Sequence, residues 1–337
     1  MSIETEAQSN KSIEIAKNRM DKAGALLDKL KSSIGAAILG QELIVDLSLC
    51  AILGGGHALL IGMPGLAKTS LVEAIAKACG LKFNRIQFTP DLMPSDILGS
   101  EVLETDKAGA RNFRFIEGPI FTQMLMADEI NRASPRTQSA LLQAMQEQRV
   151  AIAGKNRELA RPFHVLATQN PIEHEGAYPL PEAQLDRFML QINVPYPDEE
   201  IERQILLRTT SNQIATPQTA IKTSELLSLQ ELVREMPISD KFMQKALGLV
   251  RALRPQTSNL QTVKDNVEWG PGPRGGQALI MASKAHALLR GRSTPSLHDL
   301  AVVAQSALEH RMALNWRAGA NTNCRELIDV ALQNLGQ

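Results

Sequence analysis

At 337 residues, the chain is longer than one hydrophobic core usually serves, so its length predicts two domains. Its 36 Lys and Arg residues balance its 36 Asp and Glu residues, which argues against a global attraction to nucleic acid or membranes and leaves room only for a local basic groove. Its three cysteines lack metal-binding spacing, and no run of about 18 apolar residues occurs. We therefore expect a cytoplasmic protein without disulfides or membrane insertion.

Residues 1–33 predict an N-terminal helix. Apolar residues between Ile13 and Ile34 recur at alternating steps of three and four, which places them along one stripe of a helix. The stripe is short and contains two alanines. These features favour packing of the helix on its own chain over the formation of a coiled coil.

Residues 34–208 predict an α/β core. Short apolar runs alternate there with helical patterns, which is typical of a doubly wound parallel sheet with ligands at the carboxyl ends of its strands. The predicted strands are His57–Gly62, Phe83–Phe88, Met124–Glu129, His164–Asn170 and Met189–Tyr196. Two further segments, Glu101–Phe121 and Gln148–Phe163, carry a turn-forming Gly between β-like halves and predict hairpins inserted into the core.

The rest of the chain predicts a linker and a second, all-helical domain. Residues 209–224 are rich in Ser and Thr and weakly patterned, so we expect a linker there. Amphipathic segments follow within residues 225–337, which indicates a domain built from helices.

The segment Gly62–Thr69, with the sequence GMPGLAKT, predicts a phosphate-binding loop because a strand precedes it and a helix follows. Backbone N–H groups and the positive end of that helix would converge on phosphate oxygens. Lys68 would then serve the β- and γ-phosphates and Thr69 a Mg²⁺ ion; an ordinary Gly-rich turn is the weaker interpretation. The predicted nucleotide-binding residues are Gly62, Pro64, Gly65, Ala67, Lys68, Thr69 and Ser70.

Two other predicted strands end in polar side chains. Asp128 and Glu129 follow a buried strand, where Asp128 can face the Mg²⁺ and Glu129 can polarise the attacking water. Asn170 ends the strand expected beside the first, where it can hold the same water or the γ-phosphate. The competing interpretations are a solvated helix start for the two carboxylates and a common Asn-Pro turn for Asn170.

Two arginines are candidates for stabilising charge on the transferred phosphoryl group. Arg187 lies at a predicted helix end before the last strand, where it could reach the site of a neighbouring subunit. Arg274 lies in the helical domain and could fold back over the nucleotide of its own subunit. Most single arginines are surface groups, and only the motifs described above favour a catalytic role for these two.

Several motifs together resemble the MoxR family of AAA+ ATPases in order and spacing, over roughly residues 34–315. They are GQE at Gly40–Glu42, the phosphate loop, RIQFTPDLMPSDILG at Arg85–Gly99, FIEGPIF at Phe115–Phe121, DEINRASPRTQSALLQAMQE at Asp128–Glu147, ATQNPIEHEGAYPLPEAQLDRF at Ala167–Phe188 and PRGGQALIMASKAHALLRGR at Pro273–Arg292. The family loop reads GxPGxAKT, so Ala67 is a family signature. We expect Gly65 to take the conformation that tolerates no Cβ and Ala67 to have helical dihedrals.

The resemblance implies an AAA+ P-loop core with a five-stranded parallel sheet, two inserted hairpins and a helical lid, and an ATPase that uses ATP and Mg²⁺. Carried over by position, it implies Lys68 and Thr69 as phosphate and magnesium residues, Asp128 with Glu129 as the metal-and-water pair, Asn170 as first sensor, Arg187 as trans-acting finger and Arg274 as second sensor. It further implies a homo-oligomeric ring, expected to be a hexamer, that remodels or matures a client protein complex. Metalloenzymes would be among the clients, and a von Willebrand factor A domain protein is an expected partner.

A nucleic-acid motor of the related hairpin-bearing AAA+ clade is the alternative function. The segment Lys155–Arg161 is only mildly basic, and 4% aromatic residues leave few stacking platforms, so the sequence disfavours nucleic acid as a partner. A nucleotide-gated switch with little turnover is disfavoured because such a switch requires neither Glu129 nor Arg187.

Overall fold

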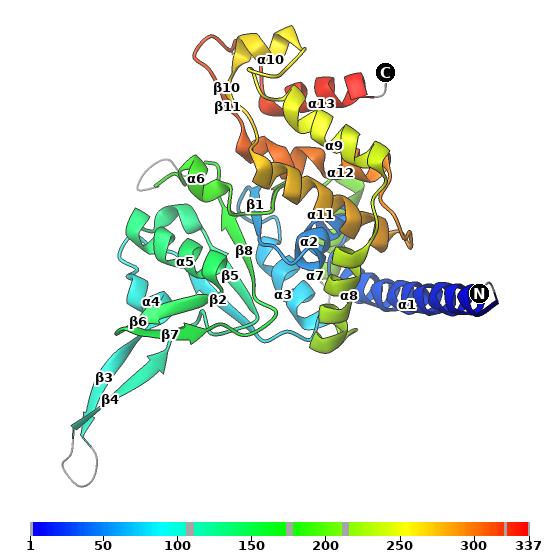
Figure 1. The fold of residues 1–337 in the computed structure, drawn as a ribbon. Coiled ribbons are helices and arrows are strands. Elements are labelled where there is room, and N and C mark those ends of the chain that lie inside the picture. Colours follow the sequence, from blue (N-terminus) through cyan, green and yellow to red (C-terminus); the bar gives the residue numbers. More distant parts are fainter. Residues whose placement is uncertain (1–2, 106–110, 173–177, 211–215, 320–321, 336–337) are drawn as a thin grey trace.

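The computed structural model describes residues 3–105, 111–172, 178–210, 216–319 and 322–335, with side chains from residue 18 onward. Figure 1 shows an α/β body with a layer of helices beside it. A long N-terminal helix and a two-stranded hairpin extend from opposite sides of the body. Within the described part of the chain, every helix is too short or too polar to span a bilayer.

A five-stranded parallel sheet forms the centre of the body. In sheet order its strands are β2 (Phe83–Gln87), β5 (Met124–Asp128), β8 (His164–Gln169), β1 (Ala58–Gly62) and β9 (Leu190–Val194). The strand predictions are confirmed, each within two residues of its ends. The strand sequences are continuously apolar because helices cover both faces of the sheet. Successive residues of β1 point to opposite faces, so Leu59 and Leu60 belong to two separate hydrophobic cores.

Helices α2 (Glu42–Leu53) and α3 (Lys68–Ala78) contribute to the core on one face of the sheet, and α5 (Pro135–Glu147) contributes to the core on the other. Helix α5 begins where the sequence specifies it. The Ser134 side chain accepts a hydrogen bond from the Thr137 N–H, and Pro135 occupies the first helical position, where its missing N–H costs nothing.

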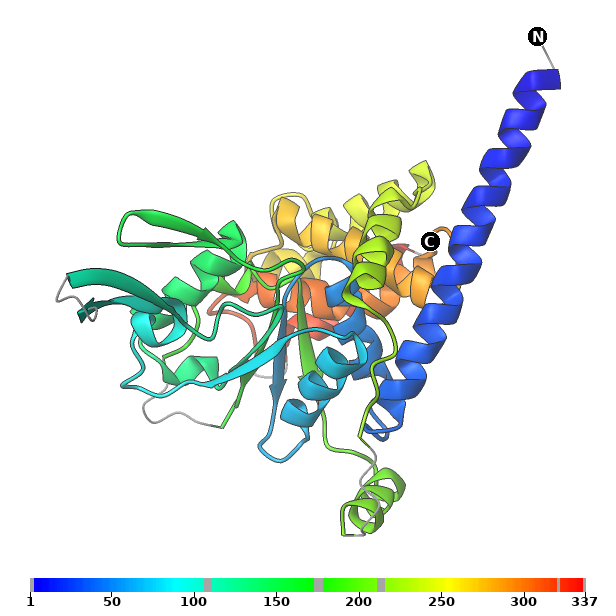
Figure 2. The same cartoon turned by 90° about the horizontal axis from the view of Figure 1, so that it is seen from below.

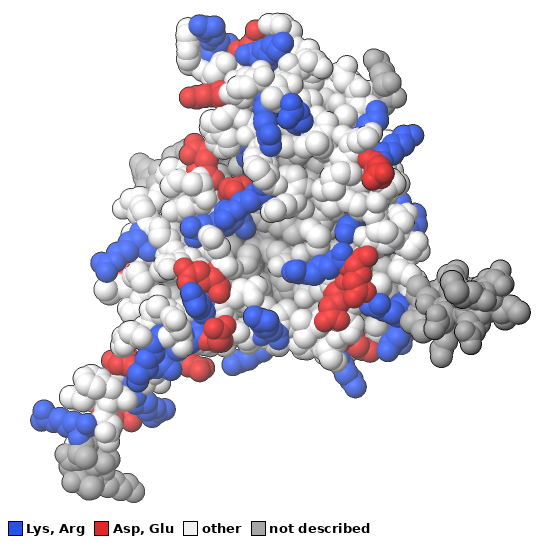
Figure 3. All heavy atoms as spheres, in the orientation of Figure 1, with Lys and Arg blue, Asp and Glu red and all other residues white. Residues whose placement is uncertain are grey.

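Both predicted hairpins are present. The first, β3 (Gly99–Thr105) with β4 (Arg111–Glu117), follows the short helix α4 (Pro94–Leu98) and extends from the body. The second, β6 (Arg149–Ile152) with β7 (Lys155–Glu158), connects α5 to β8. Figure 3 shows acidic and basic side chains intermingled over the described residues of this face, the first hairpin included.

The C-terminal part of the chain is a helical lid, as expected, with one small addition. Its helices are α8 (Thr223–Glu235), α9 (Asp240–Ala252), α10 (Gln261–Asn266), α11 (Pro273–Leu289), α12 (Leu297–Leu308) and α13 (Cys324–Leu335). Two very short antiparallel strands, β10 (Val267–Trp269) and β11 (Ala313–Leu314), make the lid not wholly helical. In the Gly-Pro-Gly-Pro run after Trp269, the last proline, Pro273, occupies the first helical position of α11, where its missing N–H costs nothing.

The N-terminal helix α1 (Ile3–Gly35) packs on its own chain through its C-terminal half, as predicted, where four apolar side chains are buried: Ala23, Leu27, Leu30 and Ile34. Its other half extends away from the body in Figure 2. The side chains of Ile13 and Ala16 lie outside the described residues. Buried Asp46 in α2 pairs with Lys31 in α1 at 2.9 Å and with Arg290, just after α11, at 2.8 Å. One carboxylate therefore connects the N-terminal helix, the core and the lid.

The predicted unit boundaries remain a prediction. The first helix runs to Gly35, helix α7 (Glu199–Thr209) precedes the predicted linker, and α8 begins within it at Thr223. The middle of that linker, residues 211–215, lies outside the described residues.

Candidate nucleotide-binding and catalytic site

The predicted phosphate loop follows β1 directly, and helix α3 begins at Lys68. Gly65 has a φ of +82°, which confirms the expectation that this position needs a residue without a Cβ. The expectation for Ala67 was wrong: its φ of 54° and ψ of 23° are left-handed, and it caps α3. The chain must turn once more before the helix starts, and for alanine this conformation costs about 1 kcal/mol.

Lys68 is held back against the loop that carries it. Its Nζ atom donates hydrogen bonds to the carbonyl oxygens of Gly62 and Met63, the second at 2.8 Å. An ammonium group offers three donors and no acceptor, so Nζ can donate to phosphate oxygens as it does to these carbonyls.

Asp128 ends β5 in a nearly closed polar environment. The Arg85 side chain on β2 donates to its Oδ2 atom at 2.5 and 3.1 Å, and the Thr168 hydroxyl on β8 donates to Oδ1 at 2.5 Å. The same hydroxyl accepts the backbone N–H of Glu129 at 2.9 Å. Strands on both sides of β5 thereby fix the direction of its last carboxylate.

Glu129 is fixed in backbone and in side chain. Its φ of 54° is left-handed, an unusual state for glutamate that stores strain in the backbone at this turn. Its Oε2 atom accepts hydrogen bonds from Gln87 at 2.6 Å and from Arg132 at 2.9 Å. The carboxylate is therefore restrained through its Oε2 atom.

Asn170 follows β8 and is buried. Gln169 pairs with Ile61, so Asn170 lies beside the start of the phosphate loop, as the sequence predicts. Its Oδ1 atom accepts the N–H of Ile172 at 3.2 Å. The fold thus brings the loop, the two carboxylates and Asn170 to one edge of the sheet, whereas their chemical roles remain predictions.

Sequence reasoning missed the residues that hold these side chains: Arg85, Gln87, Arg132 and Thr168. A signal was present for three of them, since polar residues alternate on β2 and a threonine interrupts the apolar run of β8. The pattern of polar residues does not identify which residue each side chain contacts, because that depends on which strand lies next to it in the sheet.

A cavity of about 400 Å³ opens beside the loop and was also missed. It is lined by Ala67 from the loop, by Ser70 from the first turn of α3, by Ile38 and Gln41 from the segment before α2, and by Ile205 from α7, among others. The Oε1 atom of Gln41 is buried without a hydrogen-bond partner. The cavity therefore offers apolar walls and one unsatisfied acceptor next to the phosphate loop.

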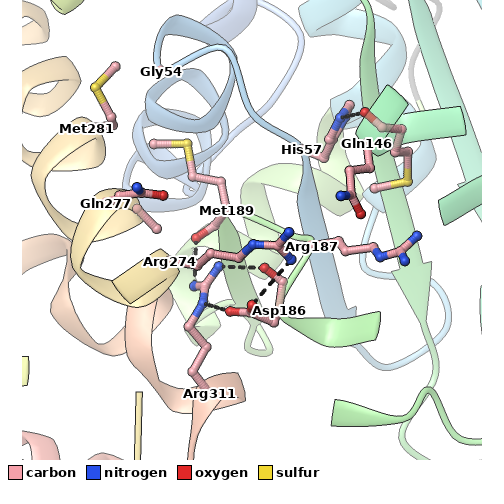
Figure 4. A pocket seen from close by; sticks show the side chains of 12 residues that line it. Gly54, His57, Gln146, Asp186, Arg187, Met189, Arg274, Gln277, Met281 and Arg311 are labelled. Atoms are coloured by element: carbon pink, nitrogen blue, oxygen red, sulfur yellow. Dashed lines mark hydrogen bonds and ion pairs between the residues drawn. The ribbon is translucent and has the colours of Figure 1, made fainter. Parts of the chain in front are cut away.

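The two candidate arginines lie elsewhere. Arg187 and Arg274 line a second cavity, of about 290 Å³, together with His57 (Figure 4). Because Leu190 pairs with Ala58 and Val194 with Gly62, residues just before β9 lie at the amino end of β1, whereas the phosphate loop lies at its carboxyl end. Arg274 therefore does not fold over the nucleotide site of its own chain, which corrects the sequence-based expectation.

Asp186 organises this second cavity. It pairs with Arg274 at 3.5 Å and with Arg311 at 2.7 Å, while the Arg187 side chain extends away from this cluster in Figure 4. Arg311, which sequence reasoning also missed, is buried and donates further hydrogen bonds to the Phe188 and Met189 carbonyls. Burial lowers the pKa of its guanidinium group and Asp186 opposes that shift, so Arg311 is a fixed cation that orients Asp186 toward Arg274.

A phosphate loop at the end of β1, a carboxylate pair at the end of β5 and a helical lid define a P-loop ATPase of the AAA+ class. The model of the ATPase family associated with various cellular activities (AAA) matches residues 57–190, and the AAA lid domain model matches residues 260–327. The chain belongs to the MoxR family of these ATPases, as its relatives show.

Chaperone MoxR1 of Mycobacterium tuberculosis is 41% identical over 305 residues, which are 90% of this chain and 79% of that protein. The protein YeaC of Bacillus subtilis is 42% identical over 291 residues, 86% of this chain and 88% of its own length. A structure of a candidate ATPase from Cytophaga hutchinsonii superimposes with a TM-score of 0.87 at 36% identity, over 96% of this chain and 98% of that one. The chain accordingly binds nucleotide, hydrolyses ATP and has the chaperone-like role of its family.

Proposed function

We propose that the protein hydrolyses ATP with Mg²⁺ in a homo-oligomeric ring, a hexamer, and uses the energy to remodel or mature client protein complexes, metalloenzymes among them. A von Willebrand factor A domain protein is the proposed partner. One observation carries the ring: Arg187 and Arg274 lie at the sheet edge opposite the chain's own phosphate loop. Arginines in that place can act on a transferred phosphoryl group only if the group belongs to a neighbour.

The residues beside the loop fit ATP. The 400 Å³ cavity can take a nucleobase between its apolar walls, and the unsatisfied Gln41 Oε1 atom can accept a hydrogen bond from the amino group of adenine. The positive end of α3 and the loop N–H groups then face the phosphates.

The donor set also fits Mg²⁺ held mainly by nucleotide and water. Thr69 and Asp128 offer hydroxyl and carboxylate oxygens, the ligand type that this ion prefers. Asp128 is already engaged by Arg85 and Thr168, so it would act through the ion's water shell. Among the described residues no three His, Cys, Asp or Glu side chains cluster into a metal site made by protein alone.

Each residue of the site then has a task. Bound ATP supplies the phosphoryl group, and bound Mg²⁺ offsets part of its charge. Lys68 exchanges the Gly62 and Met63 carbonyls for phosphate oxygens, and Glu129 leaves Gln87 and Arg132 to accept a proton from the attacking water. Asn170 positions that water, and a neighbour's Arg187 stabilises the charge that develops on the phosphoryl oxygens.

Mixing two inactive variants tests the ring. Arg187→Ala should keep nucleotide affinity and lose ATP hydrolysis by roughly 10³ to 10⁵, the range for arginine fingers. Lys68→Ala should lose tight nucleotide binding because it removes the charged side chain of the loop. Mixed together, the two should regain activity at interfaces that join an intact loop to an intact finger, and the recovery should grow with protein concentration. Absence of recovery in rings shown to be mixed, or full wild-type turnover of the monomer, would rule out the ring mechanism.

The first hairpin offers a surface for a client. Leu103 and Phe113 are paired in register, so their side chains share one face, and they are 51% and 73% exposed. An exposed cross-strand apolar pair of this kind supports contact with protein better than with nucleic acid, which would need a basic stripe. The charges around it are of both signs (Figure 3).

A further inference from the structure

A side chain of the second hairpin, Arg157, contacts the first hairpin. Arg157 on β7 places its Cζ atom 3.7 Å from the ring centroid of Phe115 on β4, and its Nη2 atom 3.7 Å from Oε1 of Glu101 on β3. Glu101 and Phe115 are register partners, so the single arginine touches both strands of the first hairpin.

This contact is more sheltered than the other ion pairs of the hairpins. The Arg157 and Glu101 side chains are 28% and 21% exposed, against 68% and 51% for Arg114 and Glu104, which pair within the first hairpin. The Arg157 Nε atom is buried and has no hydrogen-bond partner among the described residues, so the cation–π and ionic contacts are what hold this side chain. Because cation–π and ionic attractions strengthen when water is excluded, the Arg157 contact should contribute more than a surface pair does.

Each hairpin is preceded in the chain by a segment that begins at one of the two hydrogen-bond partners of Glu129. Gln87 is the last residue of β2, from which the chain runs through α4 into β3. Arg132 ends the short helix after Glu129, from which the chain runs through α5 into β6. The Thr137 hydroxyl, early in α5, donates a hydrogen bond to the Leu92 carbonyl oxygen at 2.7 Å. This bond joins the two chain segments that lead from Gln87 and Arg132 to the hairpins. The two partners of the Glu129 carboxylate therefore each precede one hairpin in the chain, with a helix between the partner and the hairpin.

We propose that Arg157 is a positioning residue that joins the two hairpins into one unit, so that a change at Glu129 on ATP binding reaches the first hairpin. The inference rests on the proposed function, since it requires Glu129 to leave Gln87 and Arg132 when nucleotide is bound. Release of both partners frees the chain segments that lead from Gln87 and Arg132 to the two hairpins. With the Arg157 contact intact the two hairpins shift together; without it the first hairpin responds only through its own connection from Gln87, and responds less.

Hydrogen exchange of the full chain, with and without the non-hydrolysable ATP analogue AMP-PNP and Mg²⁺, tests this. In the wild type the analogue should slow exchange in the phosphate loop and change exchange in β3 and β4. In Arg157→Ala the loop response should stay and the β3 and β4 response should fall by about threefold or more, the scale of a partly exposed cation–π contact. Arg157→Lys should recover part of it, because the ammonium group keeps the charge over the ring.

Two further variants separate the contact from general damage. Arg149→Ala removes an arginine of the second hairpin that pairs with nearby Glu147, and it should respond as the wild type does. Phe115→Leu keeps apolar volume and removes the ring, so it should reproduce the loss seen in Arg157→Ala even if that variant is unstable. A full β3 and β4 response in both Arg157→Ala and Phe115→Leu, with a protected loop, would refute the coupling. A wild-type loop that shows no protection would refute the proposed function and the coupling together.

Discussion

At Ala67, one backbone dihedral angle determines how a substitution by glycine changes the stability of the protein. Because its φ is 54°, Ala67→Gly removes left-handed strain rather than helical propensity. We expect the free energy of unfolding to stay level or rise by about 1 kcal/mol, with ATP hydrolysis retained. Urea unfolding measures the change.

The matched control for this prediction is Ala301→Gly. Ala301 is exposed within helix α12, so the same exchange should lower stability there by about 1 kcal/mol. Equal losses at both positions would show that Ala67 behaves as a helical residue. Loss of hydrolysis in Ala67→Gly would show that the methyl group itself positions Lys68.

Glu129 carries the next prediction. Glu129→Gln keeps an oxygen that can accept from Gln87 and Arg132, so the local structure should persist, but the amide cannot take a proton from water. The variant should bind ATP with near wild-type affinity and hydrolyse it at a small fraction of the wild-type rate. Nucleotide titration and phosphate release measure the two properties separately, and sustained turnover would mean that another residue is the base.

Among elements, helix α1 depends on the buried carboxylate of Asp46. Asp46→Asn removes the charge that pairs with Lys31 and Arg290, and both cations then lose their partner at the junction of three helices. Because the cations themselves are partly exposed, we expect a loss of roughly 1–3 kcal/mol, less than for a fully buried pair. Hydrogen exchange in residues 18–35 should also accelerate, since the N-terminal helix loses the ion pair between Lys31 and α2.

Asp21→Asn serves as the control, since Asp21 is exposed on α1. It should change neither stability nor exchange. If Asp46→Asn leaves α1 exchange at the wild-type rate, the other contacts of α1, namely its apolar stripe and polar contacts such as Arg19 with Glu235, are sufficient to hold the helix.

How far the sequence predicts this molecule also differs by element. The strands and the two hairpins could be predicted because buried parallel strands are apolar throughout and the hairpins carry glycine turns. The phosphate loop and the carboxylates could be predicted because they follow such strands. The left-handed conformation of Ala67 could not be predicted, because closure of the loop fixes the φ of this residue. The side of the sheet that Arg274 faces could not either, because the orientation of the lid, and no local pattern, decides it.

For the whole molecule, buried histidines predict sensitivity to acid. Burial lowers the pKa of His57 from 6.5 to about 3, and neighbouring His164 adds to the effect; burial likewise lowers the pKa of His164 to about 4 and of His310 to about 3. His164 lies between the Gly56 carbonyl and the Gln230 amide of the lid helix α8, and His310 contacts the Phe188 carbonyl. In their neutral form, the His164 and His310 rings therefore connect the lid to the sheet.

The sign follows from linkage. The folded-state pKa values lie below the unfolded value, so the stability is complete above about pH 6.5 and is lost as the pH falls toward the folded values. At about pH 5 the loss should be roughly 2 kcal/mol for His57 alone. Urea midpoints measured between about pH 7.5 and 5 should fall steadily, and a flat profile would show that the rings are hydrated and titrate normally.

The separation of Arg187 from the phosphate loop of its own chain has a genetic consequence. If each working site is shared between neighbours, a chain carrying Lys68→Ala and Arg187→Ala together spoils two interfaces when it enters a ring with wild-type chains. In cells that make both chains, activity would then fall with the square of the wild-type fraction rather than in proportion to it. Such an allele would be partly dominant, whereas the same two changes in an enzyme with self-contained sites would be recessive.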